Sequence, residues 1–273
     1  MKALKRLAAV PLLLLVLTSC RSVSEYMTVK AAREVIERSF GPVENVRLKC
    51  IEASGECDSY EINASDGILT ISGSSQSAIC YAFNLYLRQA CHVMSCWGGR
   101  NGDIPENWPD FSASATSPYQ LRYFLNVCTF GYTAPYWNWD RWSQEIDWMA
   151  LHGINMPLQI VGLESVWRTL LMEDYGYSEA DAEAFVPGPA YTAWWGMNNL
   201  QGWGGDKGKP ATGVKDNAWY ERQENLARRI VGRERELGMQ PVLPGFSGMV
   251  PADFSQRTGI VCENQGGWCM FQR

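Results

Sequence analysis

The sequence has 273 residues and a formal net charge of −5 at pH 7, and no basic run follows its first few residues, so its charge favours no nucleic-acid partner. Aromatic residues make up 12% of the chain, and its twelve tryptophans are well above ordinary usage. The flat faces of Trp and Tyr suit the C–H faces of sugars, although a core position is the commoner explanation for any single tryptophan.

The first twenty residues are typical of a secretory signal, because three basic residues precede an apolar run at positions 7–17. A run of about ten apolar residues is too short to span a bilayer, which takes roughly twenty. The tetrapeptide LTSC that ends at Cys20 resembles a bacterial lipobox, so we expect residues 1–20 to be a lipoprotein signal peptide and Cys20 to be lipidated. The protein is then exported and anchored to the bacterial membrane, in the periplasm or at the cell surface. The alternative is an ordinary signal in which Cys20 is incidental.

Residues 21–115 predict a small α+β domain. Apolar residues recur at helical spacing between Tyr26 and Phe40, and Gly41-Pro42 ends the predicted helix. Alternating apolar and polar residues then predict three short strands, at 46–50, 60–62 and 68–72, the last after an Asp66-Gly67 turn. A second helix is predicted where four apolar residues share one face: Ile79, Phe83, Tyr86 and Ala90. The order helix, strands, helix is that of an α+β domain.

A stretch rich in Pro, Ser, Asp and Asn, residues 101–118, is interpreted as a linker or surface crossing, and a second domain is predicted over residues 116–273. Apolar runs there predict strands, over residues 121–127, 154–161 and 239–243. Helical periods predict helices, over residues 140–152, 164–172, 178–185 and 216–237. Strands that alternate with helices indicate parallel β-α units, in a doubly wound sheet or an eightfold barrel. No dinucleotide fingerprint follows the first strand and no Walker-type phosphate loop occurs, which favours the barrel.

Distinctive motifs recur through this second domain. They are RY at 122–123 with NVCT at 126–129, EIDWMAL at 145–151 with GIN at 153–155, GPA at 188–190, AW at 193–194, GM at 238–239, PVLP at 241–244 and GMVP at 248–251. Together they resemble the α-N-acetylglucosaminidases of glycoside hydrolase family 89, and the small N-terminal domain also resembles that of the family. The chain is therefore expected to be α/β, with an α+β N-terminal domain and the first part, about three β-α units, of a TIM (β/α)8 barrel.

The resemblance implies a glycosidase that hydrolyses terminal α-linked N-acetylglucosamine from glycans with retention, and it implies no cofactor. Retaining glycosidases use two carboxyl groups about 5 Å apart, and in this family both are glutamates on later barrel strands. Because the sequence holds about three of the eight β-α units, neither glutamate has a counterpart, and we expect a truncated chain that is inactive alone. The alternative is a surface lipoprotein that binds carbohydrate without catalysis. The glycan substrate, the oligomeric state and a partner chain that completes the barrel stay open.

Five residues carry over, by the resemblance, from the sugar site of the family. Asn126 and Cys128 match pocket positions at the end of the first barrel strand, and Trp194 and Trp268 match aromatic pocket walls. Glu164 matches a position in the site wall or at a helix start, and it is also the best candidate in this chain for a general acid. The structural alternatives are a strand-end cap for Asn126 and a buried small side chain for Cys128.

Eight of the nine cysteines follow Cys20, and with the two histidines they form no metal-binding motif. Their spacings fit no paired Cys pattern, and His92 and His152 stand alone in the sequence. An exported protein can oxidise its cysteines, but the sequence does not fix their connectivity. Three pairs are near neighbours: Cys50 with Cys57, Cys91 with Cys96, and Cys262 with Cys269.

Overall fold

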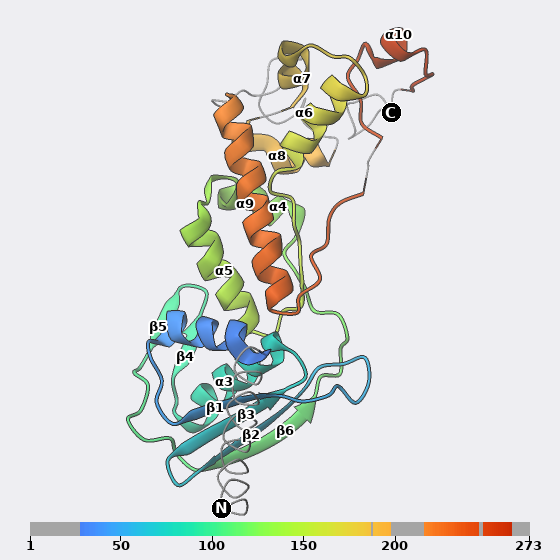
Figure 1. The fold of residues 1–273 in the computed structure, drawn as a ribbon. Coiled ribbons are helices and arrows are strands. Elements are labelled where there is room, and N and C mark those ends of the chain that lie inside the picture. The colour runs from blue at the N-terminus through green and yellow to red at the C-terminus, as the bar shows by residue number, and fades with distance from the viewer. Residues whose placement is uncertain (1–27, 187, 198–215, 246–247, 264–273) are drawn as a thin grey trace, which may run out of the picture. The chain divides into compact units, whose positions relative to one another are not determined.

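The computed structural model describes residues 28–186, 188–197, 216–245 and 248–263, and Figure 1 traces their course. The chain divides into two compact units. The first unit takes the residues up to Arg122 and two later segments, Ile146–Asn155 and Glu236–Met239. The second unit takes Tyr123–Glu145, Met156–Arg235 and the residues from Gln240 onward. Among the described residues, no helix combines the length and the apolar character that a membrane span requires.

A four-stranded sheet, in the order β1-β3-β2-β6, belongs to the first unit. β1 (Val46–Cys50) pairs in parallel with β3 (Ile68–Gly73), and β2 (Ser59–Ser65) pairs antiparallel with β3. The hairpin of β2 and β3 turns at Asp66 and Gly67, whose φ angles of 53° and 73° suit a tight two-residue turn. The three strands and the turn predicted for this domain are therefore confirmed.

A fourth strand lies inside the predicted linker at residues 101–118, which corrects that interpretation. β6 (Phe111–Thr116) pairs antiparallel with β2, with Ala113 opposite Ile62. Its Ser and Ala residues have low strand propensity and give little hydrophobic contrast, so periodicity does not reveal it. β6 forms an edge of the sheet, where short polar strands are common. A small hairpin of β4 (Met94–Cys96) and β5 (Gly99–Asn101) precedes it.

Two helices supply much of the core of the first unit, and both were predicted. The first covers residues 28–40, and the second is α3 (Gln76–Ala90), which packs on β1, β2 and β3. The hydroxyl of Ser75 begins α3 by accepting the Ala78 N–H at 3.1 Å. The fully buried side chains include members of both helices and of the sheet: Val35, Ile36, Leu69, Ile71, Ile79, Phe83, Tyr86 and Leu87.

Later segments of the chain complete this unit. α5 (Trp139–Leu151) confirms the helix predicted over 140–152, and its last residues pack in the first unit. The Asn84 side-chain amide donates to the Leu151 carbonyl at 3.0 Å, and the Arg38 guanidinium donates to both Asp147 carboxylate oxygens at 2.8 Å. Farther on, the Leu237 carbonyl accepts the Ser77 N–H at 3.2 Å. The first unit is therefore assembled from residues that lie before and after much of the second.

The strands of the second unit are shorter than the apolar runs predicted. β7 (Tyr123–Phe124) pairs in parallel with β8 (Met156–Pro157), and a single parallel bridge joins Leu158 to Val242. The run over 121–127 is interrupted because a helix already begins at Val127, and the runs near 157 and 241 contain prolines, which cannot donate to a ladder. Leu121 and Tyr123 are about half exposed rather than buried, at 53% and 49%. The parallel order of the three segments nevertheless matches consecutive β-α units.

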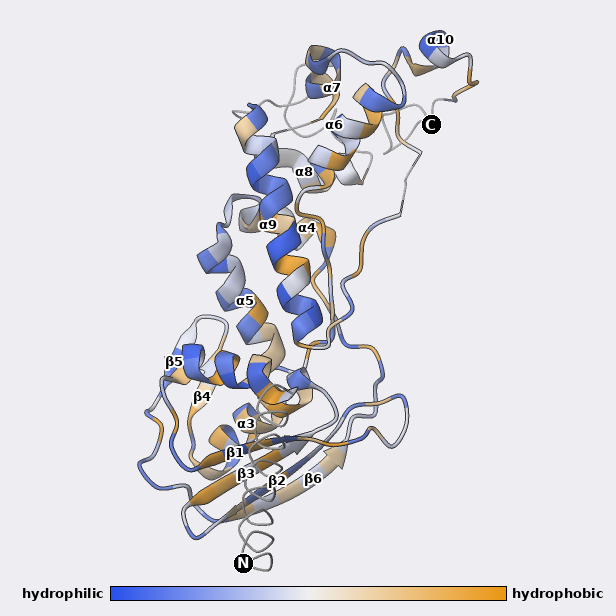
Figure 2. Cartoon of the chain, in the orientation of Figure 1, coloured by the Kyte–Doolittle hydropathy of each residue, from blue (hydrophilic) through white to orange (hydrophobic). Residues whose placement is uncertain are grey.

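Helices dominate the second unit. They are α4 (Val127–Thr133), α6 (Leu163–Glu173), α7 (Glu179–Phe185), α8 (Thr192–Gly196), α9 (Asn217–Glu236) and α10 (Phe254–Thr258), with 3-10 turns η1 (Ala134–Tyr136) and η2 (Pro189–Tyr191). α6, α7 and α9 confirm the helices predicted over residues 164–172, 178–185 and 216–237. Figure 2 shows that α9 is mostly hydrophilic, with isolated apolar positions.

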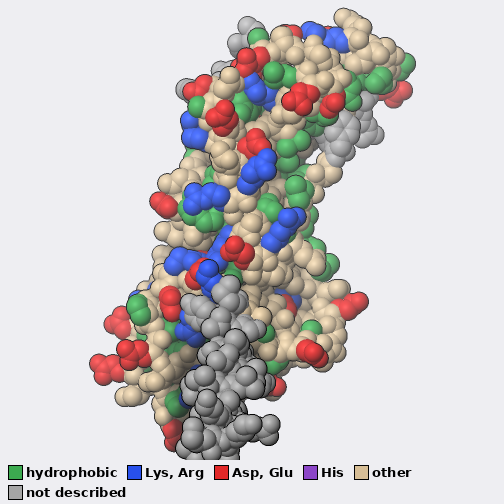
Figure 3. Space-filling view, viewed as in Figure 1, with side chains coloured by type: hydrophobic (Ala, Val, Ile, Leu, Met, Phe, Trp, Pro, Cys, Tyr) green, Lys and Arg blue, Asp and Glu red, His purple; other side chains and the backbone are tan. Residues whose placement is uncertain are grey.

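An aromatic cluster forms the main core of the second unit. Trp195 is 1% exposed, and its ring meets those of Trp167 and Phe185 edge to face, each with centroids 5.6 Å apart. Edge-to-face contacts of this kind stabilise beyond the area they bury. The other buried members come from α6, α7, α9, α10 and the segments around them: Leu171, Tyr177, Ala182, Val186, Trp219, Tyr220, Met249, Val250 and Phe254. On the face shown in Figure 3, acidic and basic side chains are interspersed.

Candidate functional site

Asn126 lies at the start of α4, two residues beyond the end of β7. Its side-chain oxygen accepts the Thr129 N–H at 2.8 Å, so the structure shows the capping role that was the alternative for this residue. The side chain is exposed, and its amide nitrogen donates to no acceptor among the described residues. The cap therefore occupies only the acceptor half of the side chain. The two N–H groups remain available to a ligand such as a sugar hydroxyl.

Cys128 and Trp194 are brought together by the packing of α4 on α8. The exposed Cys128 thiol lies 4.0 Å from the thioether sulfur of Met197, and the half-buried Trp194 ring meets Tyr132 edge to face, with centroids 6.0 Å apart. Cys128 is exposed, so the buried alternative is wrong. Asn126 and Cys128 share the first turn of α4, and Trp194 faces the next turn. The structure thus places Asn126 and Cys128 together in α4 and packs the helix of Trp194 against that same helix.

Gly131 explains why the two helices approach so closely. A Cβ atom at this position would lie 2.6 Å from the Trp194 ring and 2.9 Å from the Ala193 methyl group. The prediction of site residues did not include Gly131, Tyr132 or Met197. A glycine within a helix costs about 1 kcal/mol relative to alanine, so its presence signals a packing requirement. That signal could have identified Gly131, whereas nothing in the sequence singles out Met197.

Glu164 occupies a different environment, in the first turn of α6, where Gly162 precedes the helix in a left-handed conformation. Its side chain is 4% exposed, whereas Asn126 and Cys128 are exposed. The Ser165 hydroxyl beside it donates to the Tyr220 carbonyl at 3.0 Å. Burial, together with the charges of Glu183 and Glu164, raises the pKa of the Tyr220 phenol, against the opposing effect of Arg168. Glu164 therefore sits at a helix start, one of the two positions expected for it, where an acidic side chain favours the helix dipole.

The other predicted residues, the remaining cysteines and the histidines lie apart from the start of α4 in the sequence. Trp268 and Cys20 lie outside the described residues. Within the described ranges, no cluster of three or more His, Cys, Asp or Glu side chains could hold a metal ion, and no disulfide joins the cysteines at 50, 57, 80, 91, 96, 128 and 262. His152 stacks on Trp148 at 4.4 Å, and its two ring nitrogens lie 2.8 Å from the Trp148 carbonyl and 3.1 Å from that of Ser95. This is a structural histidine.

Comparison with known families decides which of the expected folds applies. The model of the alpha-N-acetylglucosaminidase (NAGLU) tim-barrel domain matches residues 122–273, and that of the N-terminal domain of the same proteins matches residues 30–110. The chain belongs to the alpha-N-acetylglucosaminidase family. Its fold is accordingly α/β, with the family's N-terminal domain followed by part of its TIM barrel, as predicted.

A related human protein and related solved structures each match more than nine tenths of the chain. Human alpha-N-acetylglucosaminidase is 32% identical over 259 residues, which is 92% of this chain and 34% of the human protein. The family 89 glycoside hydrolase of Clostridium perfringens in complex with 2-acetamido-1,2-dideoxynojirmycin matches with a TM-score of 0.82 and 32% identity. A variant of the Clostridium perfringens enzyme with two glutamates replaced by glutamine, in complex with its substrate GlcNAc-alpha-1,4-galactose, matches equally well. Both matches cover 94% of this chain and 29% of the solved one. The chain thus spans about a third of the length of these relatives.

Proposed function

We propose that the region around Asn126, Cys128 and Trp194 binds a terminal α-linked N-acetylglucosamine of a glycan. The observation that carries the proposal is their arrangement on α4: an amide donor pair and a small soft thiol lie in its first turn, and the ring of Trp194 packs against the next turn. An amide donor orients a sugar hydroxyl, and an aromatic face accepts the C–H face of the ring. The Clostridium perfringens relative has been solved with GlcNAc-alpha-1,4-galactose as its substrate, which supports the choice of sugar.

Binding can be tested separately from helix capping. Aspartate is as good a cap as asparagine because it keeps an acceptor oxygen, but it lacks the N–H donors. Asn126→Asp should therefore leave the fold unchanged and weaken binding of 2-acetamido-1,2-dideoxynojirmycin about tenfold, as the loss of one hydrogen bond predicts. Isothermal titration calorimetry on the purified chain measures this.

Asn138 provides a matched control, because its side-chain oxygen caps α5 by accepting the Arg141 N–H at 3.1 Å. Asn138→Asp should bind the inhibitor like the unsubstituted chain. If the two substitutions have the same effect, or if neither protein binds the inhibitor, the proposed sugar site is wrong.

For catalysis we propose that this chain is part of a retaining α-N-acetylglucosaminidase. The 273 residues alone do not catalyse the hydrolysis. Retention requires an acid and a nucleophilic carboxylate about 5 Å apart. The chain covers 29% of the solved relatives, which supports a need for residues that this chain does not supply. The purified chain should therefore release no aryl group from an aryl α-N-acetylglucosaminide. If the purified chain releases the aryl group and the Glu164→Gln variant does not, this proposal is wrong and Glu164 is a catalytic acid.

The cellular location is proposed from the N-terminal motif. The sequence LTSC before position 21 supports cleavage and lipidation at Cys20, which would anchor the protein to a bacterial membrane. Cells grown with a clickable fatty-acid analogue should label the protein, and Cys20→Ala should abolish both the label and membrane retention. A control substitution of another cysteine, Cys57→Ala, should alter neither. Unchanged labelling in Cys20→Ala would leave an ordinary signal peptide as the explanation.

A further inference from the structure

A cavity of about 350 Å³ lies in the first unit, and none of its lining residues is assigned to the sugar site above. Its lining comes from β2 and the residue before it, from α3, from the end of β6 and the segment that follows, and from the two residues after α5. The volume falls near the lower end of the range for small-molecule sites. All of its lining residues belong to the first unit, so its geometry does not depend on the second.

Three tyrosines shape the cavity. The rings of Tyr60 and Tyr81 meet edge to face, with centroids 5.7 Å apart, and Tyr119 is 68% exposed. Gly153 lets Tyr81 sit against the backbone, because a Cβ atom there would lie 3.1 Å from the ring. The hydroxyl groups of all three tyrosines have no hydrogen-bond partner among the described residues. A tyrosine hydroxyl already keeps its proton at neutral pH, and burial raises the pKa of Tyr60 further, so this group is a donor.

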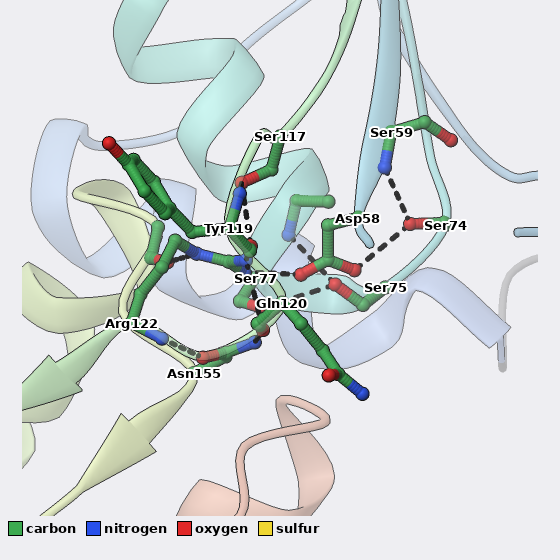
Figure 4. Close-up of polar contacts among 12 residues, drawn as sticks. Asp58, Ser59, Ser74, Ser75, Ser77, Ser117, Tyr119, Gln120, Arg122 and Asn155 are labelled. Atoms are coloured by element: carbon green, nitrogen blue, oxygen red, sulfur yellow. Dashed lines mark hydrogen bonds and ion pairs between the residues drawn. The ribbon is translucent and has the colours of Figure 1, made fainter. Parts of the chain in front are cut away.

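An ion pair that is already satisfied supplies the polar part of the lining, and Figure 4 shows the network around it. The Arg122 guanidinium pairs with Asp58, and it also donates to the carbonyls of Gly153, Tyr119 and Gln120. The second carboxylate oxygen of Asp58 accepts the Ser74 hydroxyl at 2.9 Å. Both side chains are less than a fifth exposed. Because this pair is internally neutral, it offers no net charge to a phosphate or carboxylate ligand.

These features together select a particular class of ligand. The lining combines flat aromatic surface with several hydroxyl groups and a neutralised ion pair, so it suits a small neutral molecule with one apolar face and a polar edge. A pyranose ring has that character, because its C–H groups lie on its faces and its hydroxyls lie at its rim. A purely apolar ligand would leave the three tyrosine hydroxyls unpaired, which is unfavourable in a partly buried site. We propose that this cavity is a second saccharide site, formed by residues of the first unit alone.

The test uses the full chain carrying Asn126→Asp, so that saccharide binding at the sugar site proposed above is weakened. N-acetylglucosamine, galactose and glucose serve as probes, and saturation-transfer difference NMR measures binding. Tyr119→Ala should weaken binding of the preferred sugar about tenfold, because the ring forms part of the aromatic lining. The substitution should not disturb the ion pair, since Arg122 contacts only the backbone carbonyl of residue 119. Tyr81→Phe, which removes a single hydroxyl, should weaken binding less.

Tyr136→Ala is the matched control, because Tyr136 is 63% exposed and lies outside the cavity. It should bind as the parent chain does. Equal binding by Tyr119→Ala and Tyr136→Ala would overturn the second site, and so would the absence of saturation transfer from all three sugars. Failure of the site proposed at Asn126 gives a different result, in which the chains with and without Asn126→Asp bind alike while the effect of Tyr119→Ala persists.

Discussion

The two units of this chain are stabilised in different ways. In the first, strands of five to seven residues form a continuous four-stranded ladder, and aliphatic side chains pack with the rings of Phe83, Tyr86 and Trp108 in its core. In the second, the named strands are two residues long, and the core is an aromatic cluster held between helices. The first unit is therefore stabilised by a strand ladder as well as by packing, whereas the second depends mainly on the packing of its helices around one aromatic cluster. Single substitutions in each unit should therefore have different effects on the free energy of unfolding.

The largest effect is expected at Trp195, which makes two edge-to-face contacts in the core of the second unit. Trp195→Ala should lower the free energy of unfolding of that unit by about 3–5 kcal/mol, through lost burial and the cavity left behind. Hydrogen exchange measured by mass spectrometry localises the loss. Trp97→Ala, at a tryptophan of the first unit that is 59% exposed, should change little. If Trp195→Ala accelerates hydrogen exchange in α3 as much as in the second unit, the two units unfold as one cooperative unit.

The next largest effect concerns Glu234, a carboxyl in α9 that is 0% exposed and accepts no hydrogen bond from the described residues. Burial raises its pKa from 4.5 to about 8. Between these values the folded chain keeps a proton that the unfolded chain has lost, so this residue makes the protein less stable as pH rises. Glu234→Gln removes the effect and should stabilise the protein by up to about 3 kcal/mol at pH 7, and by little at pH 4.

Chemical denaturation at several pH values between 4 and 8 tests this expectation. The curves of free energy against pH should diverge as pH rises, with the substituted chain above the original one. Glu221→Gln, at an exposed carboxylate on the same helix, should follow the original curve. Parallel curves for Glu234→Gln would mean that its carboxyl is solvated in the folded protein.

A smaller loss is expected from the ion pair inside the first unit. Asp147 is 8% exposed, but its partner Arg38 is 40% exposed, so water weakens the pair relative to a fully buried one. Asp147→Asn should lower the free energy of unfolding by about 2 kcal/mol, measured by urea denaturation. Glu34→Gln weakens pairs with Lys30 and Arg38 in which every side chain is at least 39% exposed, and it should cost less than about 0.5 kcal/mol. Equal losses would imply that the Arg38–Asp147 contact is solvated.

The smallest effect is that of the cap on α4. Asn126→Ala removes the acceptor for the Thr129 N–H and should destabilise the seven-residue helix by about 1 kcal/mol, whereas Asn126→Ser should retain most of the cap. Amide exchange within residues 127–133 measures this local change. If Asn126→Ala and Asn126→Ser exchange alike, the side-chain cap contributes nothing in solution.

The elements of the first unit could largely be predicted, because the periodicity of residues such as Ile79 and Phe83 reflects burial on one face. β6 could not, since a strand of small residues at a sheet edge leaves no such trace. In the second unit, the apolar run over 121–127 hid a change from strand to helix at Asn126, where a cap competes with the ladder. Periodicity also identifies a buried face without identifying its partner. The membership of Ile146–Asn155 in the first unit was therefore not predictable.

The hydrogen bond from Ser77 to Leu237 has a consequence for protein synthesis. The first unit holds residues up to Arg122 but also needs Glu236–Met239, which the ribosome makes more than a hundred residues later. At an elongation rate of about 5–20 residues per second, the early part of this unit waits on the order of ten seconds for its last segment. During that interval the N–H group of Ser77, in the first turn of α3, lacks its acceptor, the Leu237 carbonyl. Water or another molecule must accept that hydrogen bond until residue 239 has emerged.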